Sequence, residues 1–578
     1  DAEWGILFRE VEKFSGLDRR RVFHLAYERR FYTRTLDALA LHARRPAPTP
    51  RLPRFQAIFC IDEREESIRR HLEEAAPDAE TFVTAGFFSV AIYYKGADDA
   101  HYTPLCPAVM LPKHWVVEEV VGSLADEHAR RSRFRRVLAT AAHQVHVGSR
   151  SFLVGALLAA VGVLASVPLV ARTMFPRLTA RVRRRVTELV RAPAGTRLHI
   201  ERADPKPGPE GAHVGYTLEE LIGIGEKVLR DIGLIAGFSR LVFVFGHGST
   251  SMNNPHESAH DCGACGGSRG GPNARALAQI LNDPRVREGL ARRGIGVPAD
   301  TVFVGGMHNT SSEEVRLFDV DQVPESHREE LERAWADIEE AADRDAHERA
   351  RRFESAPLWL TPEGARRHME GRAEDLSQVR PEWGHATNAV CIVGRRSRTR
   401  GLFLDRRAFL NSYDPTQDDT DAIVLTRTLQ AVFPVCGGIN LEYYFSYVDN
   451  VGYGCGTKLP HNITSLLGVM DGAGSDLRTG LPWQMVEIHE PVRLMIVLET
   501  TPEVILRILE KHEALGRLVR NGWVKIAVLD PDSPTIRVYR DGAFYPYQAE
   551  ADLLPRAPTS VDWYRGSRDH LDFAVIGG

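Results

Sequence analysis

The sequence of 578 residues has few cysteines and almost no net charge. Seven cysteines, an odd number, are too few for a disulfide framework in a chain this long, which favours a reducing, cytoplasmic setting with thiolates free for metal. A net charge of −4, without basic residues interleaved with aromatic ones, argues against nucleic-acid binding. The glycine-rich stretch GGSRGGPNAR lacks the lysine of a Walker-type phosphate loop, so direct use of ATP is not expected.

Neither an initiator methionine nor a recognisable signal peptide opens the sequence, which starts at Asp1. We expect residues 1–50 to form a helical segment that remains from a truncated N-terminal region. The proline-rich stretch RRPAPTPRLPR then leads into the rest of the chain.

Long apolar runs are scarce, and a single one reaches the length of a membrane span. Residues 151–171 are 21 uncharged residues, SFLVGALLAAVGVLASVPLVA, against about 20 needed to cross a bilayer. Both flanks are basic, RRSRFRRV before the run and RLTARVRRRV after it. Basic flanks favour contact with an anionic membrane surface, and they equally fit solvated helix faces.

Apolar stretches typical of buried strands alternate with helical patterns along the chain. The four clearest are FQAIFC, LVFVFGHG, TVFVGGMHN and NAVCIVG. Strands that alternate with helices predict an α/β fold with a mostly parallel sheet, in which ligands bind beyond the carboxyl ends of the strands. Residues 326–354 predict a highly charged helix, and so much charge favours a solvated face over a functional patch.

Possible metal ligands collect at the ends of these predicted strands. Cys60, Asp62 and Arg64 follow the first strand at alternate positions, His247 ends the second, and Cys262 lies in the glycine-rich loop DCGACGG. Two thiolates, one imidazole and one carboxylate suit tetrahedral Zn²⁺. Each cysteine alone would more often be a small buried hydrophobe, and no second CxxC completes a four-cysteine site, so the prediction rests on their joint placement.

Two long and unusual motifs, FCIDEREESIRRHLE and GHGSTSMNNPHESAHDCGACGGSRGGPNAR, resemble those of the DabA family, the probable inorganic carbon transporter subunit. The likeness extends over most of the chain, through GGMHNT, RPEWGHATNAVCIVGRR, FLNSYDP, YYFSYVDNVGYGCGTKLPHN and EIHEPVRL. It implies a core similar to that of β-carbonic anhydrases, with large helical insertions and flanking regions.

The resemblance implies that Cys60, Asp62, His247 and Cys262 are the zinc ligands. The C-x-D-x-R signature of β-carbonic anhydrases is matched by Cys60, Asp62 and Arg64. In those enzymes the aspartate either binds zinc or pairs with the arginine, which opens the fourth position to water. They carry H-x-x-C, whereas fourteen residues separate His247 from Cys262 here, so the insert must loop out. The sequence offers His260 and Cys265 as reserve ligands.

The resemblance also implies a function and a partner. Such a subunit hydrates CO₂ to bicarbonate at the cytoplasmic face of the cell membrane, as a peripheral protein active only within its complex. A cation gradient drives the reaction through a membrane-embedded, cation-conducting DabB-like subunit related to those of respiratory complex I and antiporters. We accordingly divide the chain into residues 1–50, a zinc-binding α/β core half at 51–320 containing the apolar run, and 321–578, the charged helix with a C-terminal α/β region that completes the core.

The metal prediction constrains the apolar run, because the run lies between Cys60 and His247. A single membrane crossing would place two ligands of one site on opposite sides of the bilayer. The run is therefore expected to be a hairpin or interfacial helix, a surface that docks on the membrane partner, or a buried helix.

Two other functions remain open from the sequence. One is a soluble α/β zinc hydrolase, with Ser249 or Thr250 as nucleophile and further ligands from His308 or His489; two bound metal ions would favour it. The other is a purely structural zinc in an assembly subunit, because four protein ligands in a closed shell are normal for structural zinc.

Overall fold

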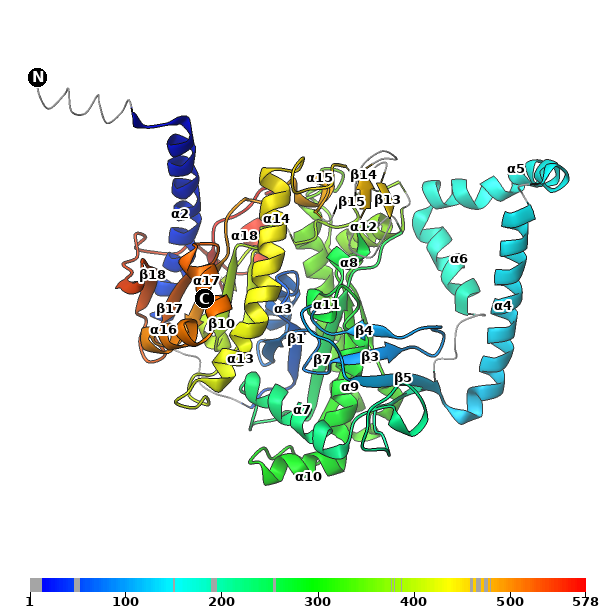
Figure 1. Ribbon diagram of the computed structural model, residues 1–578, viewed down its shortest axis with the longest axis horizontal. Helices are drawn as coiled ribbons and strands as arrows, with labels where there is room; N and C mark the ends of the chain where they lie inside the picture. The colour runs from blue at the N-terminus through cyan, green and yellow to red at the C-terminus, as the bar shows by residue number, and fades with distance from the viewer. Residues whose placement is uncertain are drawn as a thin grey trace, which may run out of the picture.

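The computed structural model confirms an α/β fold, in which strands and helices alternate along the chain (Figure 1). It describes residues 13–45, 52–148, 151–188, 195–252, 256–375, 377–378, 380–385, 387–457, 461–463, 469–471, 477–478 and 480–577.

The first large sheet carries the candidate metal ligands. Its five strands lie in the order β2-β1-β7-β8-β9. The first four are parallel to one another, and β9 is antiparallel to β8. The strands are β1 (Gln56–Cys60), β2 (Glu80–Thr84), β7 (Leu241–Gly248), β8 (Val302–Asn309) and β9 (Glu314–Leu317).

Both faces of this sheet are buried, as parallel sheets require. Along β1, Ala57 and Phe59 belong to one hydrophobic cluster, whereas Ile58 belongs to a second cluster on the other face. The helices around the sheet are α3 (Glu65–Ala75), α7 (Leu218–Asp231), α9 (Gly271–Asn282), α10 (Pro284–Arg292), α11 (Arg328–Ala350) and α12 (Pro362–Glu374).

The C-terminal region forms a sheet of its own, which corrects the expectation of one sheet containing all four predicted strands. NAVCIVG does form a strand, but this strand lies in a six-stranded sheet ordered β12-β10-β16-β17-β18-β19. The sequence pattern identifies a strand without identifying its neighbours. The strands are β10 (Val390–Gly394), β12 (Ala408–Ser412), β16 (Met495–Glu499), β17 (Lys525–Leu529), β18 (Ile536–Arg540) and β19 (Ala543–Pro546).

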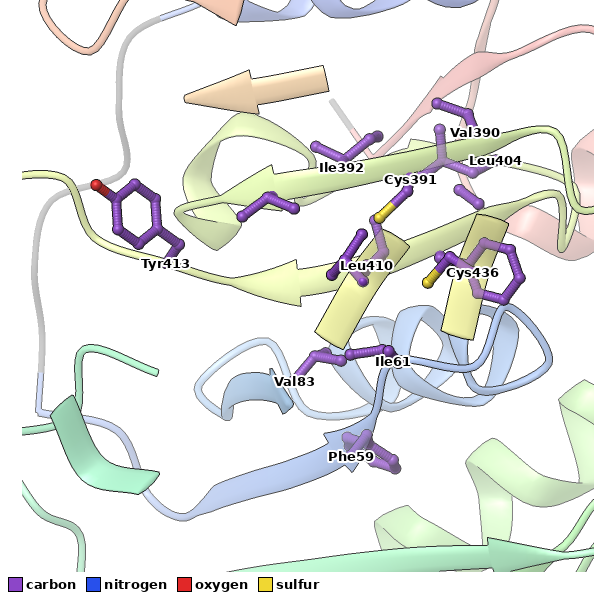
Figure 2. Close-up of a cluster of buried hydrophobic side chains, with 14 of the residues drawn as sticks. Phe59, Ile61, Val83, Val390, Cys391, Ile392, Leu404, Leu410, Tyr413 and Cys436 are labelled. Carbon is purple, nitrogen blue, oxygen red and sulfur yellow. The ribbon is translucent and has the colours of Figure 1, made fainter. Parts of the chain in front are cut away.

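The two sheets meet where their edge strands β2 and β12 lie side by side. The Val83 backbone N–H donates to Ser412 Oγ at 2.9 Å. One hydrophobic cluster spans the junction, with Phe59 contributed by the first sheet and Cys391 and Leu410 by the second (Figure 2). The two sheets therefore share a core.

Shorter elements complete the two halves. Helix α2 (Gly16–Ala43) begins with a capping box at Ser15 and lies against the C-terminal half, where Glu28 pairs with Arg493 at 2.5 Å. The second sheet is accompanied by α13 (Ile423–Val432), η7 (Phe433–Gly437), α14 (Gly438–Val448), α16 (Pro502–Lys511) and α17 (Glu513–Arg520). The small sheets comprise β3 (Ile92–Lys95), β4 (Thr103–Leu105), β5 (His114–Val120), β6 (Thr196–His199), β11 (Leu402–Phe403), β13 (His461–Ile463), β14 (Val469–Asp471), β15 (Leu477–Arg478), β20 (Arg556–Ala557) and β21 (Ala574–Ile576).

The apolar run lies in a helical arm that projects from the body of the protein (Figure 1). The arm leaves after β5 and returns at β6, and these two strands pair antiparallel. It consists of α4 (Ala125–Gly148), α5 (Phe152–Met174) and α6 (Pro176–Glu188). Phe152 is 89% exposed and Met174 is 65% exposed, so the buried-helix alternative does not describe these side chains. No helix within the described ranges combines the length and apolar character needed to cross a bilayer.

Helix α11 corrects the expectation of a solvated charged face. Glu329, Glu332 and Arg333 in its first turns are exposed, but Asp345, Glu348 and Arg349 near its end are buried. Glu348 pairs with Arg70 of α3 at 3.0 Å, and a carboxylate oxygen of Glu348 lies 2.9 Å from the His71 ring. Glu348 thus helps to hold α11 against α3, whereas Asp345 pairs with Arg406 and Arg349 pairs with Glu313.

Candidate metal centre

Three of the four expected ligands meet at the carboxyl end of the first sheet. Cys60 is the last residue of β1, His247 is the last but one of β7, and Cys262 lies in the loop that follows. The two Sγ atoms are 4.0 Å apart, and ligand atoms of all three residues lie within 4.8 Å of one another. All three side chains are buried, at no more than 2% exposure.

The fourteen residues between His247 and Cys262 loop out and return, as expected. The described part contains a short helix, α8 (Glu257–His260), before Cys262. Cys262 N–H then donates to Ser268 O at 3.1 Å, and Gly270 N–H donates to His247 O at 2.8 Å. These bonds bring the loop back to the end of β7 and place the second thiol beside the first.

Two glycines allow the backbone to approach this closely. A Cβ atom on Gly86, in the loop after β2, would lie 2.7 Å from Cys60 Sγ and 2.8 Å from Cys262 Sγ. A Cβ atom on Gly246 would lie 2.3 Å from the carbonyl group of Gly270. Neither position can accept a side chain without moving the ligand loops.

The fourth expected ligand, Asp62, is paired with Arg64. Asp62 Oδ1 accepts from Arg64 Nε at 2.8 Å, and Asp62 Oδ2 accepts from Arg64 Nη2 at 3.0 Å. The same Oδ2 lies 3.1 Å from His247 Nε2. The carboxylate therefore lies between the arginine and the three-residue cluster, within contact of both.

The sequence analysis did not identify the residues that hold Arg64. Its Nη1 donates to Glu382 Oε1 at 3.0 Å and to Thr310 Oγ1 at 3.3 Å, and its Nη2 lies 3.2 Å from His385 Nε2. On the other side of the ring, His385 Nδ1 lies 2.9 Å from Glu63 Oε1. Glu382 and His385 both lie in the motif RPEWGHATNAV. The motif is recognisable in the sequence, but nothing in it indicates that these two side chains contact Arg64.

Burial and charge set the protonation of this group. Burial raises the pKa of the Cys60 and Cys262 thiols well above the ordinary value, so a nearby cation is needed to hold them as thiolates. Burial alone would also raise the pKa of Asp62, but Arg64, followed by His385 and His247, holds that pKa well below its ordinary value. Without a bound cation, Asp62 is therefore ionised and the two neighbouring thiols are neutral.

Comparison with known proteins identifies the family. A family model described as "Probable inorganic carbon transporter subunit DabA" matches residues 4–524. The chain belongs to the DabA family.

Curated DabA relatives are similar along the whole chain. A protein of Rhodopirellula baltica, "Probable inorganic carbon transporter subunit DabA 2", is 53% identical over 579 residues, covering 100% of this chain and 54% of the relative. Proteins of the same family name from Sorangium cellulosum and Parafrankia sp. are 49% and 47% identical, each covering 98% of this chain and 55% and 54% of the relative. The chain thus spans about half the length of these relatives. No solved structure matches it.

Cys60, His247 and Cys262 fit a zinc ion in the type of their donor atoms and in the distance between their two sulfurs. Two Zn–S bonds of about 2.3 Å at a tetrahedral angle place their sulfurs about 3.8 Å apart. The observed separation between Cys60 Sγ and Cys262 Sγ is 4.0 Å. Two thiols with one imidazole are also a donor set that zinc favours over magnesium or calcium.

The two reserve ligands are placed differently. Cys265 is fully buried and belongs to the short helix directly after Cys262, with its Sγ 3.9 Å from Asn273 Oδ1. His260 has Nδ1 3.1 Å from the carbonyl oxygen of His256 and Nε2 3.9 Å from Glu382 Oε1. Neither of them belongs to the group of ligand atoms formed by Cys60, His247 and Cys262.

Among the described residues, the geometry gives the hydrolase alternative no base that would activate Ser249. Ser249 Oγ donates to Glu382 Oε1 at 2.8 Å, an oxygen that also accepts from Arg64. Burial would raise the pKa of Glu382, but Arg64 and other cations lower it to about 2, which makes it a weak base. Thr250 donates its backbone N–H to Asn309 Oδ1 at 3.1 Å.

The histidines proposed as further hydrolase ligands are engaged elsewhere. The His308 ring lies between two carboxylates, with Nδ1 2.8 Å from Glu65 Oε1 and Nε2 2.7 Å from Glu313 Oε2. His489 Nδ1 accepts from the backbone N–H of Thr387 at 3.0 Å. Neither imidazole joins the cluster around His247.

Proposed function

We propose that Cys60, His247 and Cys262 hold a zinc ion, with Asp62 as an exchangeable fourth ligand. The observation that carries the proposal is the 4.0 Å separation of two buried thiols, from loops 202 residues apart, beside a buried imidazole. A purely hydrophobic role would not require a histidine and an aspartate on the same side of the thiols.

The Asp62–Arg64 pair acts as a gate in this proposal. Zinc lowers the pKa of a bound water toward about 7 and so supplies a nucleophile at neutral pH. Arg64 holds Asp62 through two hydrogen bonds, while Glu382 holds the guanidinium in turn. Asp62 leaves its place beside His247 only if these contacts change, so a signal from a partner that moves Arg64 would change access to the site.

The proposed reaction is the hydration of CO₂ to bicarbonate within an inorganic carbon uptake system. Support comes from the printed name of the relatives and from the C-x-D-x-R motif, matched by Cys60, Asp62 and Arg64. The likeness to the β-carbonic anhydrase core remains a prediction. The reaction releases a proton with each bicarbonate, so removal of the proton by a cation-coupled partner would favour net uptake.

We further propose that the protein is peripheral, at the cytoplasmic face of the cell membrane, and that its partner is a membrane-embedded, cation-conducting DabB-like subunit. The word "subunit" in the name of the relatives implies a complex. The exposed apolar arm and the basic residues of α6 support a surface that contacts a membrane or a membrane protein.

Metal analysis of purified variants tests the site. We expect about one zinc per wild-type chain and loss of at least nine-tenths of it in Cys60→Ala and Cys262→Ala, because each variant leaves two of three clustered donors. Cys391→Ala, a buried cysteine of the second sheet, is the matched control and should retain zinc. Equal zinc in all four proteins would contradict the ligand assignment.

Deep burial also favours a second function, in which the zinc is structural. The variant Arg64→Ala distinguishes a gated catalytic zinc from a structural zinc, because it changes none of the three clustered ligands. If the pair is a gate, this variant should keep its zinc and its helical circular dichroism but lose most carbon-dependent growth at ambient CO₂, when produced with the membrane subunit. Unchanged growth with zinc retained would leave the structural function as the better account.

A further inference from the structure

The second sheet repeats the plan of the first. In each, a central strand lies between two parallel neighbours, a fourth parallel strand follows, and the next strand is antiparallel. The pairing registers also correspond, since β1 pairs with β2 over five residues ending at Cys60, and β10 pairs with β12 over five residues ending at Gly394. When β10 and β16 are aligned with β1 and β7 by these registers, Thr500 occupies the position that corresponds to His247.

The corresponding end of the second sheet has arginines instead of metal ligands. Four arginines, at positions 395, 396, 398 and 400, follow β10 directly. They adjoin a cavity of about 590 Å³, lined by Arg395, Arg398 and Arg400, by the loop 531–534 after β17, and by His42 and Arg45 at the end of α2. The cavity thus lies beyond the carboxyl ends of β10 and β17, where parallel sheets bind ligands.

The charges around this cavity are unequal. Arg395 and Arg398 share one buried carboxylate, Glu499, at 2.5 and 2.6 Å, and both also donate to the carbonyl oxygen of Pro531. Among the ion pairs of the described residues none involves Arg45 or Arg400, and Arg400 Nη2 donates to the carbonyl oxygen of Pro77 at 2.7 Å. Asp532 is the one acidic residue of the lining, so positive charge is in excess.

His42 supplies an independent observation. Its side chain lines the cavity and is 93% buried, and its Nδ1 atom has no hydrogen-bond partner among the described residues. Burial, then Arg45 and Arg396, lower the pKa of His42 to about 4, so the ring is neutral at pH 7. A buried polar atom without a partner is uncommon and indicates a missing ligand or water.

We propose that this cavity is a second ligand site, which binds the oxyanion group of a small molecule through Arg45, Arg400 and His42. Guanidinium groups bind carboxylate and phosphate oxygens in paired hydrogen bonds. The volume of about 590 Å³ is within the range for organic ligands and exceeds what one bicarbonate ion fills. A phosphate-bearing metabolite is the class that fits both charge and volume, and free bicarbonate is the other source of the same chemistry.

Calorimetric titration of the purified protein with pyrophosphate, inorganic phosphate and bicarbonate tests the proposal. The informative variant is Arg45→Gln with Arg400→Gln, because these arginines have no carboxylate to leave unpaired. Changing Arg395 or Arg398 would instead remove an ion-pair partner from the buried Glu499 carboxylate. Arg292→Gln, an exposed arginine of α10, is the matched control.

We expect saturable binding of pyrophosphate, at least tenfold weaker in the double variant and unchanged in the control, with zinc content equal in all three proteins. Saturation by bicarbonate and not by pyrophosphate would support the oxyanion site while assigning it to the carbon substrate. No saturable binding, or binding that the double variant leaves unchanged, would overturn the proposal. Because zinc content is measured in parallel, that result would not bear on the metal centre.

Discussion

Gly86 is a residue at which the metal centre leaves no room for a side chain. It comes from the loop after β2, so a third segment of chain closes over the two sulfurs. The sequence identified Cys60, His247 and Cys262 because their donor atoms are recognisable by type. It could not identify Gly86, Glu382 or His385, whose importance depends on neighbours far away in the chain.

Replacement of Gly86 by alanine should impair zinc binding without unfolding the protein. The new methyl group would lie 2.7 and 2.8 Å from the two sulfurs, well inside the contact distance of about 3.5 Å, so the thiols must separate. We expect zinc affinity to fall at least tenfold, measured by competition with a chelator, while circular dichroism stays unchanged.

The matched control is Gly223→Ala in α7, where an added methyl group meets nothing within 4 Å. It should bind zinc as the wild type does. Wild-type affinity in Gly86→Ala would mean that the sulfurs are free to adjust, and that the site is less tightly packed than the structure indicates.

At the scale of elements, α3 and α11 show why charge patterns were misleading. The sequence EESIRRHLEEA forms helix α3, and nearly all of the charged side chains of this helix are buried. Arg70 pairs with Glu66 of the same helix and with Glu348 of α11, and its guanidinium lies over the Phe403 ring at 4.4 Å. A sequence shows the charges along one helix and cannot show that a second helix will neutralise them.

Stability should depend on Glu348 in a defined pH range. Arg70 and His71 overcome burial and lower the pKa of Glu348 to about 2, below its unfolded value of about 4.3. A lowered carboxyl pKa contributes stability that is complete above the unfolded pKa and is lost as pH falls toward 2. Glu348→Gln should cost about 3 kcal/mol at pH 7, because it removes a buried carboxylate from Arg70, which then keeps only Glu66 as an ion-pair partner.

Urea unfolding between pH 7 and pH 3 measures this effect. The difference between wild type and Glu348→Gln should be constant down to about pH 4.5 and shrink below it. Glu329→Gln on the same helix, with a side chain 86% exposed, is the control and should change stability by less than about 0.5 kcal/mol. A Glu348→Gln effect that persists unchanged to pH 3 would contradict the argument.

At the scale of the whole molecule, the arm of α4, α5 and α6 is set apart from the two sheets (Figure 1). Helix α6 pairs with α12 through Arg183 and Glu374 at 2.5 Å. Its apolar residues Leu178 and Val182 are each 56% exposed, one turn apart. The sequence could predict the apolar run and, given the metal prediction, argue against one complete crossing. The pairing of β5 with β6, between which the arm leaves and returns, required the structure.

Charges on the apolar side of α6 should prevent association with membranes. Leu178→Glu with Val182→Glu removes two apolar contacts, each worth about 1.5–3 kcal/mol when buried, and adds repulsion from anionic lipid. We expect at least a tenfold drop in the fraction bound to anionic vesicles or to membranes containing the partner, measured by sedimentation.

Leu111→Glu with Leu553→Glu is matched in charge and replaces two highly exposed leucines outside the arm, 82% and 84% exposed. This control should bind membranes as the wild type does. An equal loss of membrane binding in both double variants would indicate a general effect of negative charge. Wild-type membrane binding by both would place the membrane contact outside this side of α6.

The shared core of the two sheets has a consequence for how the protein is made. All three clustered donors precede residue 263, so they leave the ribosome well before β10 exists. Glu382 and His385, which contact the Arg64 guanidinium, are synthesised more than a hundred residues later. If the proposed zinc assignment holds, a nascent chain would possess all three metal donors before it possesses the residues that hold Arg64, and synthesis of the second half would set when the finished centre closes.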